Sequence, residues 1–227
     1  MAEVDVIIEI SKGGHIKYEY DKERNILNCD RILHTPMKYP FNYGFIPNTL
    51  SEDSDPLDVV VLMDDELVPG CLIKCKILGY LETKDDAGND PKIIVCPIGK
   101  VDPMWNNIDD LMAIDSVNLI NNFVNKEIEY LNKMSLCDND NSNLSLFKVN
   151  VLTLYRIKYF FEHYKDLENK KVEVGNFYNK EHAINIYKDS IERFKTNKIY
   201  GFLHMHWLTN QGSVQKTKIT DFFERIK

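Results

Sequence analysis

The chain has 227 residues, of which 44% are hydrophobic and 28% charged, and it carries a formal net charge of −7 at pH 7. This composition is typical of a globular protein with one domain of ordinary size. The negative charge argues against nucleic acid or an anionic membrane surface as the main partner. No apolar run approaches the ~18 residues that a membrane-spanning helix needs.

The first part of the chain is rich in short strand-like segments. We expect strands at 4–10, 17–20, 26–33, 59–62, 71–81 and 93–97, because apolar and β-branched residues gather there between turn residues. The segment 39–50 is rich in Pro, Asn and Tyr and predicts an ordered loop. Many short strands with turns between them favour a small closed barrel over a sheet of βαβ units.

The pattern then changes to helical spacing. Apolar residues recur at helical intervals over 117–134 and over 151–167, and a polar break at 138–145 separates these two helices. A third helix is predicted from about Glu181 to Lys195, with Asn179 as its N-cap.

The tail that follows is aromatic and basic in places. His204 and His206 would share one face of a strand there, but no third metal ligand lies nearby. Packing of the tail against the body or a partner subunit explains these residues better than a metal site.

The five cysteines predict reduced thiols. Their number is odd, and the acidic N-terminus lacks the features of a secretory signal, so we expect a reducing compartment and a cytoplasmic protein. Cys71 and Cys75 are four residues apart in a strand-like run and therefore share one face. No second pair follows at zinc-finger spacing, which favours buried apolar thiols.

Two acidic loops, at 53–58 and 85–92, are the most informative part of the sequence. The first reads Asp-Ser-Asp-Pro-Leu-Asp, so three carboxylates fall within six residues. Carboxylates this close are costly to keep charged unless cations lie between them. Hard ions such as Mg²⁺ take oxygen ligands and are often shared with substrate phosphates. The loops therefore indicate a multi-metal phosphoryl-transfer site.

Simpler interpretations of the first loop have to be weighed. Asp and Ser bond their own backbone and Pro presets φ, so an acidic loop is often only a solvated turn. An EF-hand is excluded, because its sixth position needs Gly and its twelfth Glu, where this chain has Asp58 and Asp64. The rest of the chain favours a site, because it supplies the cations and phenols that a phosphate needs.

These additional polar residues lie before and after the acidic loops. Glu9 and Arg31 stand in apolar runs, where an unpaired charge is costly to bury. Lys17 and Glu19 alternate with apolar residues and share one face of their strand, which alone would describe a surface pair. Two tyrosines fall in the predicted loop and a Tyr-Lys pair ends the second helix: Tyr39, Tyr43, Tyr164 and Lys165.

Taken together, these residues resemble the soluble family I inorganic pyrophosphatases. The acidic motif of that family, Asp-x-Asp-Pro-x-Asp followed by an aliphatic residue, is matched by residues 53–59. The resemblance covers 8 to about 97, resumes at 160–168 and fades through the helix that ends near Lys195. It implies an α+β fold, with a five-stranded OB-like β-barrel flanked by helices, a helical insertion and a C-terminal extension.

The resemblance also implies the domain plan and the activity. The whole chain, 1–227, would form one inorganic pyrophosphatase domain, with 1–98 mostly β-barrel, 99–195 helical with the insertion, and 196–227 the extension. It would hydrolyse pyrophosphate to two orthophosphates with several Mg²⁺ ions per site, for which Mn²⁺ or other divalent metals could substitute.

Fourteen residues match functional positions of the family. Asp55 matches the general base. Asp53, Asp58, Asp85 and Asp90 match metal ligands. Lys17, Arg31, Tyr43, Lys92, Tyr164 and Lys165 match the phosphate-binding set, and Glu9, Glu19 and Tyr39 match residues that orient these groups, Glu19 also supporting a metal through water.

This set is chemically consistent with the implied reaction. Pyrophosphate has no apolar handle, so only cations and hydrogen-bond donors can hold it. Two metal ions that share a water lower its pKa, and the resulting metal-bridging hydroxide attacks phosphorus in line while Asp55 takes the proton.

Two other classes of function stay open. A two-metal phosphatase that acts on organic phosphates would use similar ligands. A non-catalytic OB-fold binding module would need a basic, aromatic groove, which the acidic loops oppose. The stretch 99–159 is longer than in compact bacterial members of the family, so their subunit contacts need not carry over. We expect a homo-oligomer, with a dimer preferred over a hexamer, and pyrophosphate and phosphate as small-molecule partners.

Overall fold

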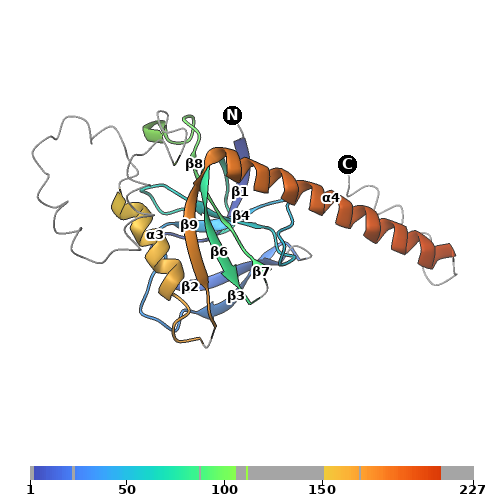
Figure 1. Cartoon of the computed structure of the whole chain (residues 1–227), viewed down its shortest axis with the longest axis horizontal. Helices are drawn as coiled ribbons and strands as arrows, with labels where there is room; N and C mark the ends of the chain where they lie inside the picture. Colours follow the sequence, from blue (N-terminus) through green and yellow to red (C-terminus); the bar gives the residue numbers. More distant parts are fainter. Residues whose placement is uncertain are drawn as a thin grey trace, which may run out of the picture.

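The computed structural model describes residues 3–21, 24–86, 88–105, 111, 151–168 and 170–210. Figure 1 shows a β-barrel with helix α3 along its side and the long helix α4 leaving it. The strands are β1 (Glu3–Ile10), β2 (Ile16–Asp21), β3 (Ile26–Ile32), β4 (Asn42–Ile46), β5 (Leu57–Val61), β6 (Leu72–Asp85), β7 (Gly88–Asn89), β8 (Lys92–Pro97) and β9 (Glu173–Asn179). The helices are the short 3₁₀ turn η1 (Pro103–Trp105), α3 (Val151–His163) and α4 (Lys180–Asn210).

Five of the strands close into a barrel. In the order β1, β4, β5, β8 and β6, each strand bonds the next, and β6 pairs back with β1. All these pairs are antiparallel except β5 with β8, which is parallel. Closure covers the strand edges where β1 and β6 pair, but the second half of β6 extends beyond β1 and keeps an edge that another strand can pair with. The predicted five-stranded, OB-like barrel and the α+β class are confirmed.

Hydrophobic side chains form two clusters, one inside the barrel and one on its outer face. The inner cluster takes residues from all five barrel strands, among them Ile8 and Val59, and Ala183 of α4 joins it. The outer cluster contains Val60, the next residue of β5, and packs under Phe160 of α3. Because successive side chains of a strand point to opposite faces, one strand serves both clusters and anchors both helices.

Strands β2 and β3 form a separate hairpin beside the barrel. Its register sets Lys17 opposite Arg31. Lys17 Nζ lies 2.5 Å from Glu19 Oε1, so the predicted shared face is confirmed. The backbone N–H of Tyr20 donates to Glu9 Oε1 at 2.7 Å, which joins the hairpin to β1. The hairpin thus brings charged side chains of both signs next to the barrel.

The predicted strands agree with β1, β2, β3, β5, β6 and β8 to within a few residues. The prediction of a loop throughout 39–50 is wrong, because β4 lies within it. A Cβ on Gly44 of β4 would collide with the carbonyl oxygen of Ile7, so this glycine lets β4 approach β1 closely. Strand β9, which extends the sheet beside β6, was not predicted.

The helical predictions were partly right. Asn179 caps α4, since its Oδ1 accepts the backbone N–H of His182 at 3.0 Å. The helix continues past the predicted end at Lys195 to Asn210. The strand considered at His204 and His206 is not formed, because both residues lie within this helix. The helix expected at 117–134 and the break at 138–145 lie outside the described residues.

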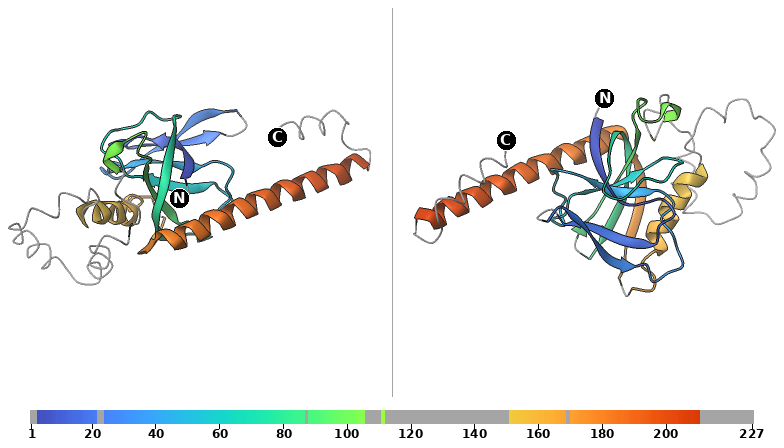
Figure 2. Two further views of the ribbon diagram at one scale, coloured as in Figure 1. Left: turned by 90° about the horizontal axis from the view of Figure 1, so that it is seen from above. Right: turned by 180° about the vertical axis from the view of Figure 1, so that it is seen from behind.

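Helix α4 is 31 residues long and leaves the body of the protein. Its first turns pack on the barrel through Ala183, and its C-terminal half runs clear of the strands (Figure 2). No helix among the described residues is long and apolar enough to cross a bilayer.

Cys75 is buried in the inner cluster, as predicted, whereas Cys71 is only partly buried against it. Among the described cysteines, these two, Cys29 and Cys96 are free thiols.

Candidate active site

A cavity of about 240 Å³ gathers the predicted site residues where the hairpin β2–β3 and the two acidic loops meet. Thirteen of the fourteen residues line it, and the exception is Arg31. The thirteen are Glu9, Lys17, Glu19, Tyr39, Tyr43, Asp53, Asp55, Asp58, Asp85, Asp90, Lys92, Tyr164 and Lys165. The structure therefore brings together side chains that lie up to about 150 positions apart in the sequence.

The first acidic loop is a tight turn held by its own backbone. The carboxylate of Asp53 accepts the N–H of Asp55 at 3.0 Å, as the solvated-turn interpretation expected of an Asp side chain. The N–H of Ser51 donates to the carbonyl of Asp55 at 2.7 Å, and Ser54 has a φ of 74°. These bonds set the turn, while the exposed side chain of Asp55 and the neighbouring carboxylates line the cavity. The loop is thus both an ordinary turn and part of the site.

The second acidic loop is held by β6. The N–H of Asp90 donates to the carbonyl of Thr83 at 2.9 Å, and the Thr83 hydroxyl donates back to the carbonyl of Asp90. Burial raises the pKa of the Asp90 carboxyl to about 7; Lys92 opposes this effect and Asp58 adds to it. Asp90 is therefore a carboxylate whose charge needs a nearby cation.

Lys92 supplies a cation at the centre of the cavity. Its side chain is 3% exposed, and its Nζ lies 2.6 Å from Asp58 Oδ2 and also contacts Asp90. Burial alone would lower the pKa of Lys92, but the carboxylates of Asp58 and Asp90 outweigh it and raise that pKa above its usual value. Tyr43 Oη donates to the same Asp58 oxygen at 2.5 Å. Asp58 is the common acceptor of the site.

In the described part of the chain, no three Asp, Glu, His or Cys side chains are grouped closely enough to form a metal centre as they stand. The carboxylates of Asp58 and Asp90 contact the ammonium of Lys92 instead. A divalent cation would therefore have to share or replace this contact.

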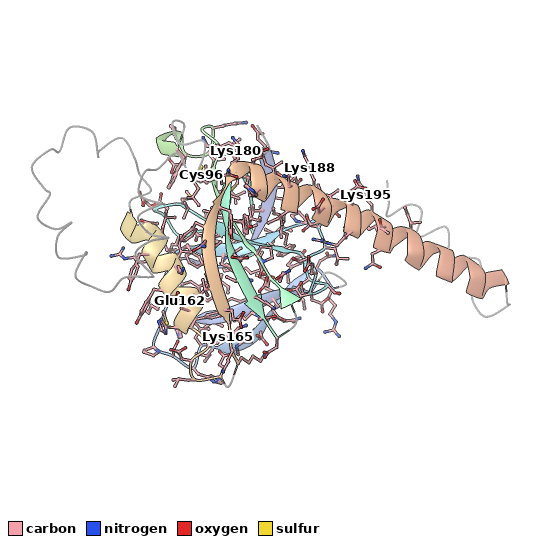
Figure 3. All side chains as sticks on the ribbon, viewed as in Figure 1. Cys96, Glu162, Lys165, Lys180, Lys188 and Lys195 are labelled. Carbon is pink, nitrogen blue, oxygen red and sulfur yellow. The ribbon has the colours of Figure 1, made fainter. Side chains whose placement is uncertain are left out.

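Lysine and tyrosine side chains face the acidic loops from α3 and the hairpin. Lys165 follows the C-terminal end of α3 (Figure 3), and its Nζ lies 3.7 Å from Asp85 Oδ2. Burial lowers the pKa of Lys165, against the opposing effect of Asp85. Burial raises the pKa of the Tyr164 phenol, which therefore keeps its proton at neutral pH. These groups offer one point charge and one neutral donor to an anion.

Glu9 and Tyr39, two of the three residues expected to orient the others, line the cavity and contact its neighbouring elements. Glu9 Oε1 accepts the N–H of Tyr20, and burial raises the pKa of Glu9 to about 7, with that hydrogen bond acting in the opposite direction. Tyr39 is buried, with its ring centroid 5.5 Å from that of Tyr43 and 4.5 Å from that of Phe160. Tyr39 thus packs between the site and α3.

Arg31 does not line the cavity, and its donors bind two carboxylates. Its Nε and Nη2 each lie 3.1 Å from one oxygen of Glu168, and its Nη1 lies 2.6 Å from Asp30. Glu168 is 6% exposed and is the partner that sequence reasoning missed. A signal for it was available, because Glu168 ends the segment that contains Tyr164 and Lys165 and a buried carboxylate needs a cation.

The barrel and the cavity together define an α+β barrel protein with a site suited to a highly charged anion and its counter-cations. A family model described as inorganic pyrophosphatase matches residues 6–195. The chain therefore belongs to the inorganic pyrophosphatase family, and the resemblance drawn from the sequence is confirmed.

Individual relatives agree with this assignment. The chain is 40% identical over 194 residues to an inorganic pyrophosphatase of Saccharolobus solfataricus, which covers 85% of this chain and 92% of the relative. Its structure is similar to that of an inorganic pyrophosphatase from Helicobacter pylori, with a TM-score of 0.68, 37% identity and coverage of 86% and 94% of the two chains. The corresponding enzyme from Coxiella burnetii gives a TM-score of 0.67, 36% identity and coverage of 85% and 95%.

Proposed function

We propose that this chain hydrolyses inorganic pyrophosphate to two orthophosphates and uses Mg²⁺ to do so. The observation that carries the proposal is the cavity of about 240 Å³ whose lining combines lysines and phenols with five aspartates. Such a lining suits an anion whose charge must be met by cations and donors on every side. Membership of the pyrophosphatase family supports the same substrate.

The donor set of this cavity fits a hard divalent cation. Mg²⁺ takes oxygen ligands, and the pKa of Asp90, raised to about 7 by burial, reflects a negative charge that nearby cations must offset. The residues that would hold Mg²⁺ are Asp53, Asp58, Asp85 and Asp90, with Glu19 acting through water. When bound, Mg²⁺ lowers the pKa of a water molecule and offsets the charge of the phosphates, and Mn²⁺ or another divalent metal is expected to substitute.

The lysines and tyrosines of the cavity would bind the phosphoryl oxygens. Lys17, Lys92 and Lys165 supply positive charge, and Tyr43 and Tyr164 donate hydrogen bonds without adding charge. Burial raises the pKa of both phenols, so they stay protonated at neutral pH. These groups would also neutralise the charge that develops on the departing phosphate.

Asp55 is the residue that we assign as general base. Its backbone is held on both sides, by the Asp53 carboxylate and by the Ser51 N–H, while its side chain is exposed in the cavity. As the attacking water oxygen bonds to phosphorus, its proton would pass to a carboxylate oxygen of Asp55. The bond from phosphorus to the bridging oxygen breaks, and the electron pair leaves with the second phosphate.

Arg31 has a less direct part in this proposal. Its Nε and Nη2 bind Glu168, so its guanidinium is fixed in place beside Lys17. We assign it to the phosphate-binding set, at the rim of the cavity and oriented by Glu168.

The direct test is release of phosphate from pyrophosphate by purified protein, with and without Mg²⁺. D55N should lower turnover by roughly 10²- to 10⁴-fold, the usual share of a general base. D64N is the matched control, because Asp64 is exposed on a neighbouring loop outside the cavity lining and should leave turnover unchanged. Nucleotides and sugar phosphates are assayed in parallel. A preference for them would favour an organic phosphatase, and no hydrolysis of any compound would favour a binding module.

We further propose that residues 1–227 form a single domain that assembles as a homo-oligomer in the cytoplasm, a dimer before a hexamer. The buried, reduced thiol of Cys75 is compatible with a reducing compartment. Light scattering on a sizing column distinguishes a mass of two chains from a mass of six.

A further inference from the structure

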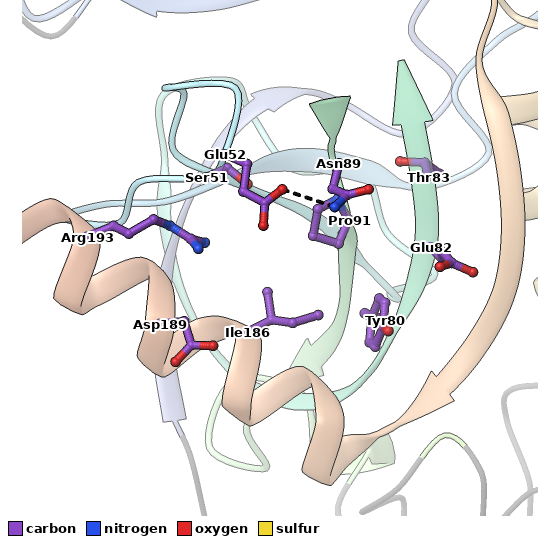
Figure 4. A pocket seen from close by; sticks show the side chains of 10 residues that line it. All are labelled: Ser51, Glu52, Tyr80, Glu82, Thr83, Asn89, Pro91, Ile186, Asp189 and Arg193. Atoms are coloured by element: carbon purple, nitrogen blue, oxygen red, sulfur yellow. Dashed lines mark hydrogen bonds between the residues drawn. The ribbon is translucent and has the colours of Figure 1, made fainter. Parts of the chain in front are cut away.

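A second cleft, of about 210 Å³, lies between helix α4, the segment before the first acidic loop and part of the second acidic loop (Figure 4). Its lining includes Arg193 of α4, Glu52 beside the first loop, and Asn89 and Pro91 on either side of Asp90. It shares no lining residue with the catalytic cavity. Helix α4 therefore lies near both acidic loops without contributing to the lining of the catalytic cavity.

Helix α4 binds the segment that leads into the first acidic loop at Leu50. Arg193 Nε donates to the carbonyl of Leu50 at 2.9 Å. The N–H of Leu50 donates to the carbonyl of Ser190 at 3.0 Å, and Ser190 is fully buried. Both backbone groups of Leu50 are thus bonded to a regular helix, and one of the two bonds comes from a charged donor, which is the stronger kind.

The peptide group between Leu50 and Ser51 connects Arg193 to Asp55. The next residue, Ser51, donates its N–H to the carbonyl of Asp55 at 2.7 Å. Asp55 therefore lies only two hydrogen bonds from Arg193. A loop at an active site keeps its geometry only when neighbouring groups fix it, and small displacements of a catalytic group are costly.

The same segment also bonds the second acidic loop. Asn89 Nδ2 donates to Glu52 Oε2 at 3.0 Å, as the dashed line in Figure 4 shows. Asn89 directly precedes Asp90, whose own N–H is bonded to β6. The segment 50–52 thus connects α4, the first loop and the second loop.

We propose that Arg193 is a positioning residue for hydrolysis. By holding the carbonyl of Leu50, it fixes the backbone at Asp55 relative to the aspartates of both loops. The inference rests on the proposed pyrophosphatase activity and adds a residue that touches neither substrate nor metal.

The test compares R193M with K188M. Methionine keeps an unbranched, flexible stem but removes the guanidinium and its donors. Lys188 is an exposed residue of the same helix outside both cavities (Figure 3). R193M is expected to lower kcat by roughly ten- to a hundredfold, the cost of a misplaced catalytic group. The KM for pyrophosphate should stay within about twofold, because Lys17, Lys92 and Lys165 lie on other elements. The Mg²⁺ concentration for half-maximal rate should rise, because Asp53 and Asp58 shift with the loop. R193K, which keeps a charged donor, is expected to recover most of kcat.

Three results would overturn the proposal while the wild-type protein is active: unchanged kcat in R193M, an equal loss in K188M, or a rise in KM without a fall in kcat. Inactive wild-type protein would instead contradict the proposed function itself. All variants are compared at a temperature where thermal melts show them folded.

If R193M does not fold, amide hydrogen exchange of the wild type replaces it. Protection of the Leu50 and Ser51 amides close to that of the buried part of α4 is expected, and exchange as fast as in an exposed loop would overturn the proposal.

Discussion

Replacing Lys92 with methionine should destabilise the metal-free protein, and the loss should grow with pH. Methionine keeps the buried stem but removes the ammonium that contacts Asp58 and Asp90. Breaking a buried ion pair from one side costs about 3–5 kcal/mol, because a charge is left without a partner. The loss is limited, however, because a buried carboxyl can take up a proton instead of remaining charged.

The pH dependence follows from Asp90. Its folded-state pKa is raised from 3.8 to about 7, mainly by burial, so between these values the folded protein holds a proton that the unfolded chain lacks. Stability therefore falls as pH rises through that window, by at most about 1.4 kcal/mol per pH unit, and levels off above pH 7. Without Lys92 the pKa of Asp90 lies higher, so the stability of the variant continues to decrease above pH 7. Between pH 7 and pH 9 the difference from the wild type should thus grow by up to about 3 kcal/mol.

Urea denaturation at pH 6, 7, 8 and 9 with a chelator present measures this difference. K74M is the matched control, because Lys74 pairs with Asp5 at the surface, where an ion pair contributes little to stability. K74M should show a small, pH-independent change. Parallel stability curves for K92M and the wild type would refute the reasoning, since they would mean that Lys92 does not hold the charge of Asp90.

Three further predictions concern metal, Arg31 and Glu9. Mg²⁺ at a hundred times its dissociation constant should stabilise the wild type by about 2.7 kcal/mol and raise its melting temperature by roughly 5–10 °C; an equal rise in D90N would contradict binding at this site. R31A should cost about 2 kcal/mol in urea melts, because it leaves Glu168 buried without its cation, and should also raise the KM for pyrophosphate. Adding E168Q to R31A should restore stability but not KM, and recovery of both would remove Arg31 from the phosphate-binding set. The pKa of Glu9 is raised from 4.5 to about 7, mainly by burial, so ionisation costs the folded protein stability as pH rises through that window. With a chelator present, the free energy of unfolding of E9Q relative to the wild type should therefore increase from pH 5 to pH 7 and stay constant above pH 7. A difference that does not change between pH 5 and pH 7 would argue against a buried, protonated Glu9.

The barrel strands could be predicted where burial leaves a local pattern of apolar residues in the sequence. Alternation in β1 and the apolar runs of β5 and β8 are local signals, and the structure confirms them. Strand β4 was missed because Pro40, Asn42 and Gly44 are typical of loops, whereas Gly44 is required by the close approach of β1. Strand β9, which contains Gly175 and Asn176, forms because β6 offers an edge to pair with. In both cases tertiary contact outweighed local preference.

The site was predicted for a different reason. Nothing in the spacing of Asp53 and Lys165 says that they line one cavity, and their assignment came from the resemblance to a family rather than from local pattern. Where the resemblance offered no guidance, long-range partners were missed. The hydrogen bond between Arg31 and Glu168 joins residues 137 positions apart, and the hydrogen bond from Arg193 to Leu50 joins residues 143 positions apart. Such pairs follow from the path of the chain in space and leave no periodic trace in the sequence.

The ammonium of Lys92 between Asp58 and Asp90 has a consequence for the order of assembly. Many small metal-binding domains cannot fold until the ion arrives, because nothing else cancels the charge of their ligands. In this chain the ammonium of Lys92 offsets the charge of Asp58 and Asp90 without a metal ion. Folding can therefore precede metal binding. Under the proposed dependence on Mg²⁺, a shortage of divalent cations would leave the protein inactive but with its barrel folded.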